Sequence, residues 1–329
     1  KYLLLPFSLL FKTFVFFRNY FYDKGIISVH KLPCSVISVG NITVGGTGKT
    51  PFVVYLSKIL KNKFNYKVAI LSRGYKRETS GTVLVSNNKS WNTFGDEPYM
   101  MFKQLKNIPI VVDENRYRGG SFLVKKYNPD VIILDDGFQH RSLHRDFNIA
   151  LINGNDSKMD YKIIPQGRLR EPWENLKRAD AIFITKDKPK QFLLKKLKNS
   201  KIKYYNTKTH SALVQASSLK NVLNIKLKEK KAFLLSGIAD PENFKKTVIN
   251  QNFKIVGYKF LPDHYNFDQK TINKTTVNAK RASADYIITT EKDWVKIDHL
   301  KVKFPFLIVQ IKLEIIEKNI IETIIKYIK

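Results

Sequence analysis

The sequence predicts an α/β protein with a parallel sheet that carries a glycine-rich loop, a second, smaller α/β domain, and an N-terminal helix. From Cys34 onward, short apolar runs alternate with amphipathic stretches, which is the pattern of right-handed βαβ units and of a sheet covered on both faces. The glycine-rich loop separates the first apolar run from the first amphipathic stretch. After a lysine-rich stretch at 186–203 the alternation starts again.

A length of 329 residues suits two domains. We expect an N-terminal helix at 1–27, a first domain at 28–212 and a second at 213–329, with the boundary within 207–225. The alternative for the end of the chain is that the final helix packs back on the first domain. In the first domain the pattern predicts strands at 34–39, 68–71, 83–86, 108–112, 131–134, 149–152 and 181–185, and helices at 49–60, 97–105 and 116–127. In the second it predicts strands at 232–235, 254–260, 286–289 and 306–312.

The chain is strongly basic, with 58 Lys and Arg against 28 Asp and Glu and a net charge of +30. This charge admits a nucleic acid, an anionic membrane surface or an acidic substrate as partner. Lysines solvated on exposed faces explain it equally well, so the charge alone identifies no partner. The single cysteine, Cys34, excludes an internal disulfide framework and cysteine-based zinc sites; because it opens an apolar run, we expect a buried structural thiol.

The first 25 residues are apolar and aromatic but carry scattered basic side chains. The run from Tyr2 to Phe17 is short for a spanning helix, and no small-residue cleavage site of a signal peptide follows it. Aromatic and aliphatic residues interleaved with Lys and Arg are typical of a helix lying on an anionic membrane surface. The alternative is a helix packed on the protein's own core.

The glycine-rich loop predicts nucleotide binding. It comprises Thr43, Val44, Gly45, Gly46, Thr47, Gly48, Lys49, Thr50 and Pro51. The glycines let backbone N–H groups turn toward phosphate oxygens, and the start of the following helix adds its dipole. Lys49 would reach the β- and γ-phosphates of ATP or GTP, and the Thr50 hydroxyl would bind Mg²⁺. Thr43 stands where the usual pattern has glycine, and Gly45 and Gly46 compensate for it.

Asp135 and Asp136 end the predicted strand at 131–134. An acidic residue at the carboxyl end of a strand beside a phosphate loop orients Mg²⁺, and two adjacent carboxylates are costly to hold without a cation. We therefore expect Asp135 and Asp136 to be magnesium ligands, without deciding which of them contacts the ion. The alternative is a turn aspartate at a strand end.

Transfer of phosphate to an alcohol also needs a group that accepts the hydroxyl proton. Asp96 is the leading candidate, although an Asp before Glu-Pro also suits a helix N-cap. His264 lies in a predicted turn, where a lone histidine is usually structural. Several arginines fall in loops expected at the same sheet edge and could bind a substrate phosphate or the transferring phosphoryl group: Arg73, Arg116, Arg168 and Arg170.

These motifs, taken in order along the chain, resemble those of the tetraacyldisaccharide 4′-kinases, the lipid A kinases of Gram-negative bacteria. The segments that carry the resemblance are Ser38–Asn41, Val44–Pro51, Leu71–Tyr75, Gly95–Pro98, Leu134–His140, Gly167–Pro172, Ser236–Pro241, Pro262–His264 and Thr289–Asp293. The resemblance implies two RecA-like domains and transfer of the γ-phosphate of ATP to the 4′-hydroxyl of a tetraacyl disaccharide 1-phosphate. It also implies an N-terminal helix at the inner face of the cytoplasmic membrane.

The same resemblance assigns roles to individual residues. It implies that Asp96 is the catalytic base and that His264 works with it. It implies that Asp135 and Asp136 serve the Mg²⁺ site, alongside Lys49 and Thr50 of the phosphate loop. Arg170 and Glu171 match a family motif near the active site and, with Arg73 and Arg116, are candidates for substrate binding.

Two alternatives remain at this stage. A membrane-associated P-loop ATPase of the positioning and partitioning type shares Gly-Gly-x-Gly-Lys-Thr, but it places a lysine before the glycine pair, where this chain has Val44. A nucleic-acid-binding protein would interleave basic and aromatic residues on one face, whereas the lysines here are scattered. We therefore expect no nucleic-acid partner, and because nothing in the sequence demands a multimer, we expect a monomer.

Overall fold

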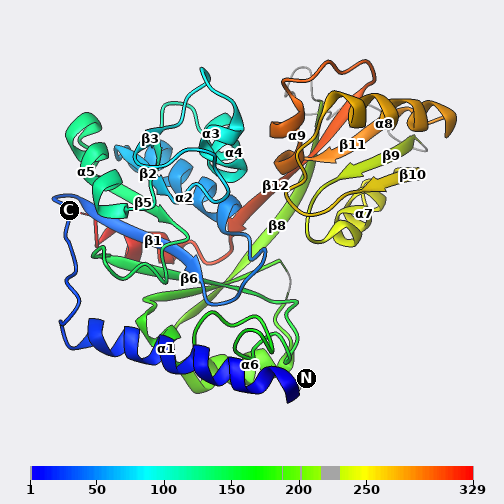
Figure 1. Cartoon of the computed structure of the whole chain (residues 1–329). Coiled ribbons are helices and arrows are strands. Elements are labelled where there is room, and N and C mark those ends of the chain that lie inside the picture. The colour runs from blue at the N-terminus through cyan, green and yellow to red at the C-terminus, as the bar shows by residue number, and fades with distance from the viewer. Residues whose placement is uncertain (1, 187, 201, 216–229, 329) are drawn as a thin grey trace. The chain divides into compact units, whose positions relative to one another are not determined.

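The computed structural model describes residues 2–186, 188–200, 202–215 and 230–328 (Figure 1). The chain divides into two compact units, Lys1–Thr209 with Leu313–Lys329, and His210–Lys312. Residues 313–329 thus belong to the first unit, whereas the sequence pattern placed them in the second domain. Part of the boundary expected within 207–225 lies outside the described residues, because these stop at 215 and resume at 230.

The first unit is built on a sheet in the order β8-β7-β6-β1-β5-β2-β4-β3. Its strands are β1 (Ser35–Asn41), β2 (Val68–Ser72), β3 (Val83–Leu84), β4 (Ile110–Val112), β5 (Val131–Asp135), β6 (Phe147–Asn153), β7 (Ala181–Thr185) and the start of β8 (Tyr204–Gln215). Neighbours in this order pair in parallel, except that the short edge strand β3 is antiparallel to β4. The predicted α/β class with a mainly parallel sheet is therefore confirmed.

Helices follow the strands of the first unit as the alternation predicts. They are α1 (Leu5–Asp23), α2 (Lys49–Phe64), α3 (Trp91–Phe94), α4 (Asp96–Gln104), α5 (Arg116–Tyr127), α6 (Gln191–Ser200) and α10 (Asn319–Ile325), with 3-10 turns η1 (Tyr2–Leu4) and η2 (Trp173–Arg178). The central strands are buried on both faces, as parallel strands under helices must be.

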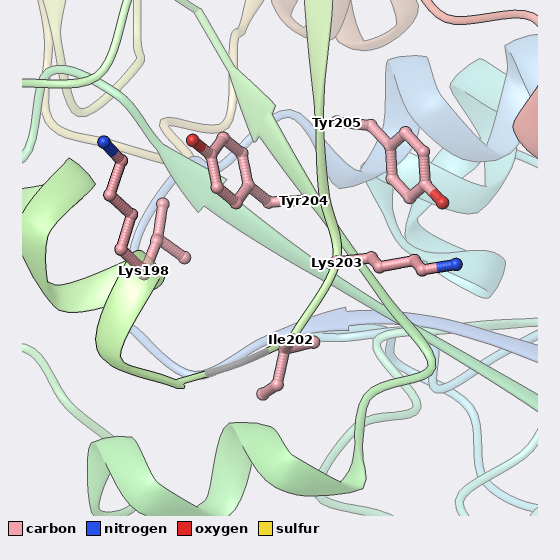
Figure 2. A pocket seen from close by; sticks show the side chains of 6 residues that line it. Lys198, Ile202, Lys203, Tyr204 and Tyr205 are labelled. Atoms are coloured by element: carbon pink, nitrogen blue, oxygen red, sulfur yellow. The ribbon is translucent and has the colours of Figure 1, made fainter.

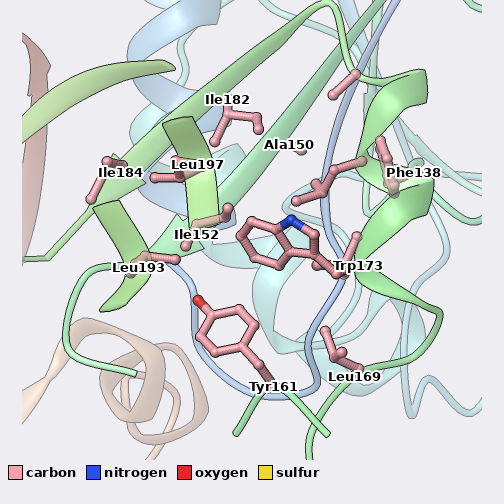
Figure 3. Packing of buried hydrophobic residues seen from close by; sticks show 13 residues of the cluster. Phe138, Ala150, Ile152, Tyr161, Leu169, Trp173, Ile182, Ile184, Leu193 and Leu197 are labelled. Carbon is pink, nitrogen blue, oxygen red and sulfur yellow. The ribbon is translucent and has the colours of Figure 1, made fainter. Parts of the chain in front are cut away.

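One core cluster of the first unit lies under the loop that precedes η2 (Figure 3). Tyr161 and Trp173 meet edge to face, with ring centroids 5.2 Å apart, among aliphatic side chains of β6, β7 and α6. Leu169 and Ile42 are buried in the same cluster. This packing fixes the segment around Leu169 against the end of β1, where the glycine-rich loop begins.

The second unit contains β9 (Lys231–Ser236), β10 (Lys254–Phe260), β11 (Tyr286–Thr290) and most of β12 (Phe306–Ile315) in the order β10-β9-β11-β12. These strands are parallel. The connecting helices are α7 (Pro241–Ile249), α8 (Gln269–Arg281) and α9 (Glu291–Ile297). The strands β8 and β12 each carry the chain from one unit into the other.

The N-terminal helix α1 has two different sides. Ser8, Val15 and Asn19 are buried against the first unit, where the Ser8 hydroxyl donates to the Ile163 carbonyl at 3.1 Å. Large apolar side chains on and just before α1 remain exposed: Leu3, Leu4, Leu5, Phe7, Leu9, Leu10, Phe14, Phe16, Phe17, Tyr20 and Phe21. Within the described part of the chain, no helix combines the length and apolarity needed to cross a bilayer.

The sequence led us to expect a buried thiol at Cys34. In the structure Cys34 is instead half-buried, at the edge of a second core cluster of the first unit. Burial still raises the pKa of its thiol to about 11. The difference arises because Cys34 immediately precedes β1, where the chain enters the sheet.

Candidate active site

The glycine-rich loop connects β1 to α2 in the first unit. Gly48 adopts a left-handed conformation (φ 80°) at the N-cap, and Lys49 is the first residue of α2. Thr47 is held from two sides: its hydroxyl accepts from the Asn41 amide at 2.8 Å, and its carbonyl accepts from the Thr185 hydroxyl at 2.7 Å. The loop is therefore shaped by bonds to the ends of both β1 and β7.

Lys49 lies at the mouth of this loop, where its Nζ is 3.5 Å from Oδ1 of Asp136 and 3.5 Å from the Asn41 amide oxygen. Asp136 follows β5 directly and also accepts from Arg170 Nη1 at 3.1 Å. Burial opposes ionisation of Asp136, but Lys49 and Arg170 hold the pKa of its carboxyl below the usual range. Asp136 is thus a charged carboxylate shared by two cations.

Asp135 directly precedes Asp136 in the chain but has a different environment. It is the last residue of β5 and is 2% exposed; its Oδ2 accepts from the Ser72 hydroxyl at 2.9 Å. No described residue bonds its Oδ1, which is buried. Burial, together with the nearby carboxylates of Glu97 and Asp136, raises the pKa of Asp135 to about 7.

An unpartnered buried carboxylate oxygen beside a second carboxylate is a setting that favours a cation. Among the described residues no group of three or more His, Cys, Asp and Glu could hold a metal. Mg²⁺ is commonly bound by one or two carboxylates together with substrate phosphates rather than by a protein cage, so an acidic pair is a candidate site for it. The Thr50 side chain, buried in the first turn of α2, belongs to the same loop.

Asp96 is the first residue of α4, and Gly95 holds the N-cap position. Asp96 is 3% exposed, and its Oδ1 accepts from the Glu97 backbone N–H at 2.9 Å. Because Glu97 acts on the pKa of Asp135, the start of α4 lies near the carboxyl end of β5. Asp96 therefore lies on the same edge of the sheet as the acidic pair.

Two of the predicted arginines, Arg73 and Arg116, lie close enough at this edge to repel each other electrostatically. Arg116, at the start of α5, is 4% exposed, and its Nη1 donates to the carbonyls of Asp113 and Glu114 at 3.2 and 3.1 Å. Burial and the neighbouring Arg73 lower the pKa of Arg116 to about 10, against the opposing effect of Asp135 and Asp136. Two neighbouring guanidinium groups are suited to binding an anion.

Glu171 occupies a different position from the arginines. Its carboxylate is fully enclosed; it accepts from Gln139 at 2.9 Å and Asn175 at 3.0 Å, and it pairs with Arg178. Gln139 in turn accepts from Arg170 at 3.3 Å. Glu171 thus supports Gln139, which in turn contacts Arg170 beside Asp136, and no part of Glu171 is open to solvent.

His264 belongs to the second unit, whereas Asp96 belongs to the first. It has a left-handed backbone (φ 64°), and its N–H donates to the Gly237 carbonyl at 3.1 Å. Its Nε2 lies 3.2 Å from Lys292 Nζ and 3.7 Å from Asp263 Oδ2. The predicted partnership of His264 with Asp96 stays a prediction.

The family follows from comparison with known proteins. The family model described as tetraacyldisaccharide-1-P 4′-kinase (LpxK) matches residues 1–329. The chain belongs to the tetraacyldisaccharide 4′-kinase family. A relative of that name from Aquifex aeolicus is 40% identical over 298 residues, 89% of each chain. Another, from Flavobacterium psychrophilum, is 38% identical over 307 residues, covering 89% of this chain and 86% of the relative.

A solved structure of the family agrees with the fold. The LpxK of Aquifex aeolicus, described as an "apo" form in complex with ATP, superposes with a TM-score of 0.81 at 35% identity. The alignment covers 99% of this chain and 98% of that one. The predicted family and its kinase class are thereby confirmed, and the ATPase and nucleic-acid alternatives lose their support.

The sequence analysis assigned no role to several residues around the phosphate loop and the acidic pair. Ser72, Gln139 and Thr185 bind Asp135, Glu171 and the phosphate loop respectively. Each lies at or just beyond the carboxyl end of a core strand, which is the signal that could have found them.

A shallow cavity of about 370 Å³ lies elsewhere on the first unit (Figure 2). It is lined by Leu197, Lys198, Ile202, Lys203, Tyr204 and Tyr205. None of the residues of the phosphate loop or the acidic pair lines it.

Proposed function

We propose that this chain transfers the γ-phosphoryl group of ATP to the 4′-hydroxyl of a tetraacyl disaccharide 1-phosphate, the reaction that its relatives' names describe. The observation that carries the proposal is the meeting of Lys49 with Asp136, beside Asp135, at the adjoining ends of β1 and β5. A phosphate loop joined to an acidic strand end is the arrangement that phosphoryl transfer needs.

The residues from Thr43 to Pro51 would hold the ATP phosphates. Backbone N–H groups of the loop and the start of α2 would face the phosphate oxygens, and Lys49 would supply a charge to the β- and γ-phosphates. The bonds from Asn41 and Thr185 to Thr47 already hold the loop in shape, so the loop would not need to rearrange during the reaction.

Thr50, Asp135 and Asp136 would hold Mg²⁺. The unpartnered Oδ1 and raised pKa of Asp135 support its assignment as the carboxylate that a cation would stabilise most. Asp136 is already neutralised by Lys49 and Arg170, so it would contribute less than Asp135 to holding the cation. Bound Mg²⁺ supplies charge that neutralises the phosphate oxygens as the terminal phosphoryl group is transferred.

Asp96 would accept the proton of the 4′-hydroxyl, and His264 would assist it. The new bond joins the sugar oxygen to the γ-phosphorus, the bond from that phosphorus to the β,γ-bridging oxygen breaks, and ADP leaves. Burial of Asp96 at the start of α4 supports a base that is shielded from water and aligned by the Glu97 backbone.

Arg73 and Arg116 would bind an anionic group of the substrate, since they bring two positive charges to one place beside the acidic pair. Arg170 would position Asp136, and Glu171 would support Gln139 and Arg170. Both of the latter roles are indirect.

The exposed apolar side of α1 would lie on the inner leaflet of the cytoplasmic membrane, where an acylated substrate resides. The Lys- and Arg-rich chain favours an anionic surface. We propose that the kinase works there as a peripheral monomer with no nucleic-acid partner.

The test is to incubate the protein with γ-labelled ATP, Mg²⁺ and the monophosphorylated tetraacyl disaccharide in detergent. Label in the lipid fraction supports the proposal. Label recovered only as free phosphate would return the chain to the ATPase alternative.

A further inference from the structure

The guanidinium of Arg168 lies directly against Gly45 of the phosphate loop. Gly45 has φ 102°, and a Cβ built on it would overlap Nη2 of Arg168 and stand 3.1 Å from its Cζ. Any side chain at position 45 would therefore displace this guanidinium. Glycine is required here both by the backbone conformation and by the arginine.

The backbone explains why Arg168 faces the loop. Residues 42–44 and 168–170 pair in an antiparallel manner: Val44 N–H donates to the Arg168 carbonyl at 2.7 Å, and Arg170 N–H donates to the Ile42 carbonyl at 2.7 Å. Neighbouring residues of an extended segment point to opposite sides. Leu169 points into the core cluster (Figure 3), so Arg168 and Arg170 point toward the site.

The guanidinium is held from behind. Its Nε donates to the Val44 carbonyl at 2.8 Å, and its Nη1 donates to Asp156 at 3.3 Å and lies 3.8 Å from Asp160. Asp156 is itself 3% exposed. For Nη2, the nitrogen nearest to Gly45, the described residues supply no hydrogen-bond acceptor.

A second cation, from another segment, lies near the phosphate loop. The ammonium of Lys186, the residue after β7, is 4.0 Å from the position of a Cβ on Gly46. The two adjacent glycines of the loop thus face one positive side chain each. A charge arrangement of this kind around backbone N–H groups is suited to a polyphosphate.

Resting on the proposed function, we propose that Arg168 is a further catalytic residue, whose Nη2 binds the γ-phosphoryl group of ATP and neutralises the charge that develops on it. As the bond from the sugar oxygen to the γ-phosphorus forms and the bond to the β,γ-bridging oxygen breaks, the proton passes to Asp96 and ADP departs. Arg168 takes no proton and forms no covalent bond. It would serve as an arginine supplied by the chain itself, fixed before the nucleotide arrives.

The alternative is that Arg168 only supports the loop through Val44. The two roles differ in their dependence on the terminal phosphate. A residue that binds the γ-phosphoryl group contributes to the affinity for a non-hydrolysable ATP analogue but not for ADP. A loop support contributes to both.

The test compares Arg168→Ala and Arg168→Lys with the unchanged protein. Calorimetry would give the affinity for Mg²⁺-ADP and for the non-hydrolysable analogue, and label transfer would give kcat. We expect Arg168→Ala to bind ADP normally, to lose at least about tenfold in affinity for the analogue, and to lose roughly 1000-fold in kcat. Added guanidinium should restore part of the kcat that Arg168→Ala loses. The kcat of Arg168→Lys should lie between those of Arg168→Ala and the unchanged protein.

Lys162→Ala is the matched control, since it removes one exposed positive charge from the segment that also carries Arg168. It should change none of these quantities. An equal loss of affinity for ADP and for the analogue in Arg168→Ala, or an unchanged kcat, would overturn the proposal. If the unchanged protein labels no lipid, the proposed function fails, while the two affinities still decide the role of Arg168.

Discussion

Lys49 pairs with Asp136 and not with Asp135: its Nζ lies 3.5 Å from Oδ1 of Asp136, while Asp135 accepts from Ser72 and keeps one buried oxygen without a described partner. Asp136 adopts φ 51°, which turns the chain as it leaves β5. Two adjacent carboxylates are thereby given different electrostatic surroundings. One is neutralised by the protein's own cations, and the other remains available to a metal ion.

Replacing Lys49 by Ala should remove the charge at the mouth of the phosphate loop. We expect kcat/KM for ATP to fall by roughly 100- to 1000-fold, because the charge acts on phosphate oxygens in a partly buried site. Steady-state label transfer measures this. Lys63→Ala, which changes an exposed lysine of the same helix, is the control and should leave kcat/KM unchanged. Equal losses in both variants would contradict the assignment.

Asp135 should make the metal-free protein less stable as the pH rises. Its pKa is raised on folding from 3.8 to about 7, so its contribution is fully present below pH 3.8 and is lost as the pH rises through about 7. About 3 pKa units at about 1.4 kcal/mol each set an upper limit of about 4 kcal/mol. Asp135→Asn carries no such titration.

Thermal unfolding in EDTA at pH 6 and pH 8 measures the effect. We expect Tm of the unchanged protein to fall relative to that of Asp135→Asn between these two values. Mg²⁺-ATP should raise Tm of the unchanged protein more than that of the variant, most strongly at pH 8. Parallel pH curves for the two proteins would show that Asp135 does not titrate in this range.

Asp96→Asn should distinguish two roles for Asp96, that of a catalytic base and that of a residue that only stabilises the start of α4. The amide keeps an oxygen that can accept from the Glu97 N–H, so α4 should remain folded and KM for ATP should change little. We expect kcat to fall by roughly 1000-fold, within the range for loss of a general base. Normal turnover with a lowered Tm would instead make Asp96 a structural residue of α4.

The exposed side of α1 should bind anionic membranes. Leu10→Glu with Phe14→Glu changes two exposed side chains, 69% and 66% accessible, and should greatly reduce co-sedimentation with anionic lipid vesicles. Val277→Glu, on an exposed apolar position of α8, is the control and should bind as before. Unchanged binding of the α1 variant would mean that this side has another role.

Cys34 should react slowly with thiol reagents in the folded protein. Burial raises the pKa of its thiol to about 11, so the thiolate is scarce at pH 8. Alkylation followed by mass spectrometry should be slow in buffer and fast in denaturant. Equally fast labelling in both would show that the segment before β1 opens readily.

The sequence sufficed for the features that depend on local pattern. The strand–loop–helix around Lys49 and the acidic pair at the end of β5 lie where the alternation predicts them. The supporting bonds could not be predicted, because Glu171 meets Gln139 and Arg178, and Arg168 meets Gly45, only through the fold. The sequence left open whether the final helix returns to the first unit, as residues 313–329 do, because a strand's pattern does not reveal which sheet it joins.

The most direct test of the central claim locates the transferred phosphate. The lipid product made from γ-labelled ATP and the disaccharide 1-phosphate would be treated with mild acid, which releases a phosphate from an anomeric carbon far faster than one from a secondary alcohol. Our account predicts a bisphosphorylated lipid that loses its original phosphate and keeps the label. Label released together with the anomeric phosphate, or absent from the lipid, would contradict it.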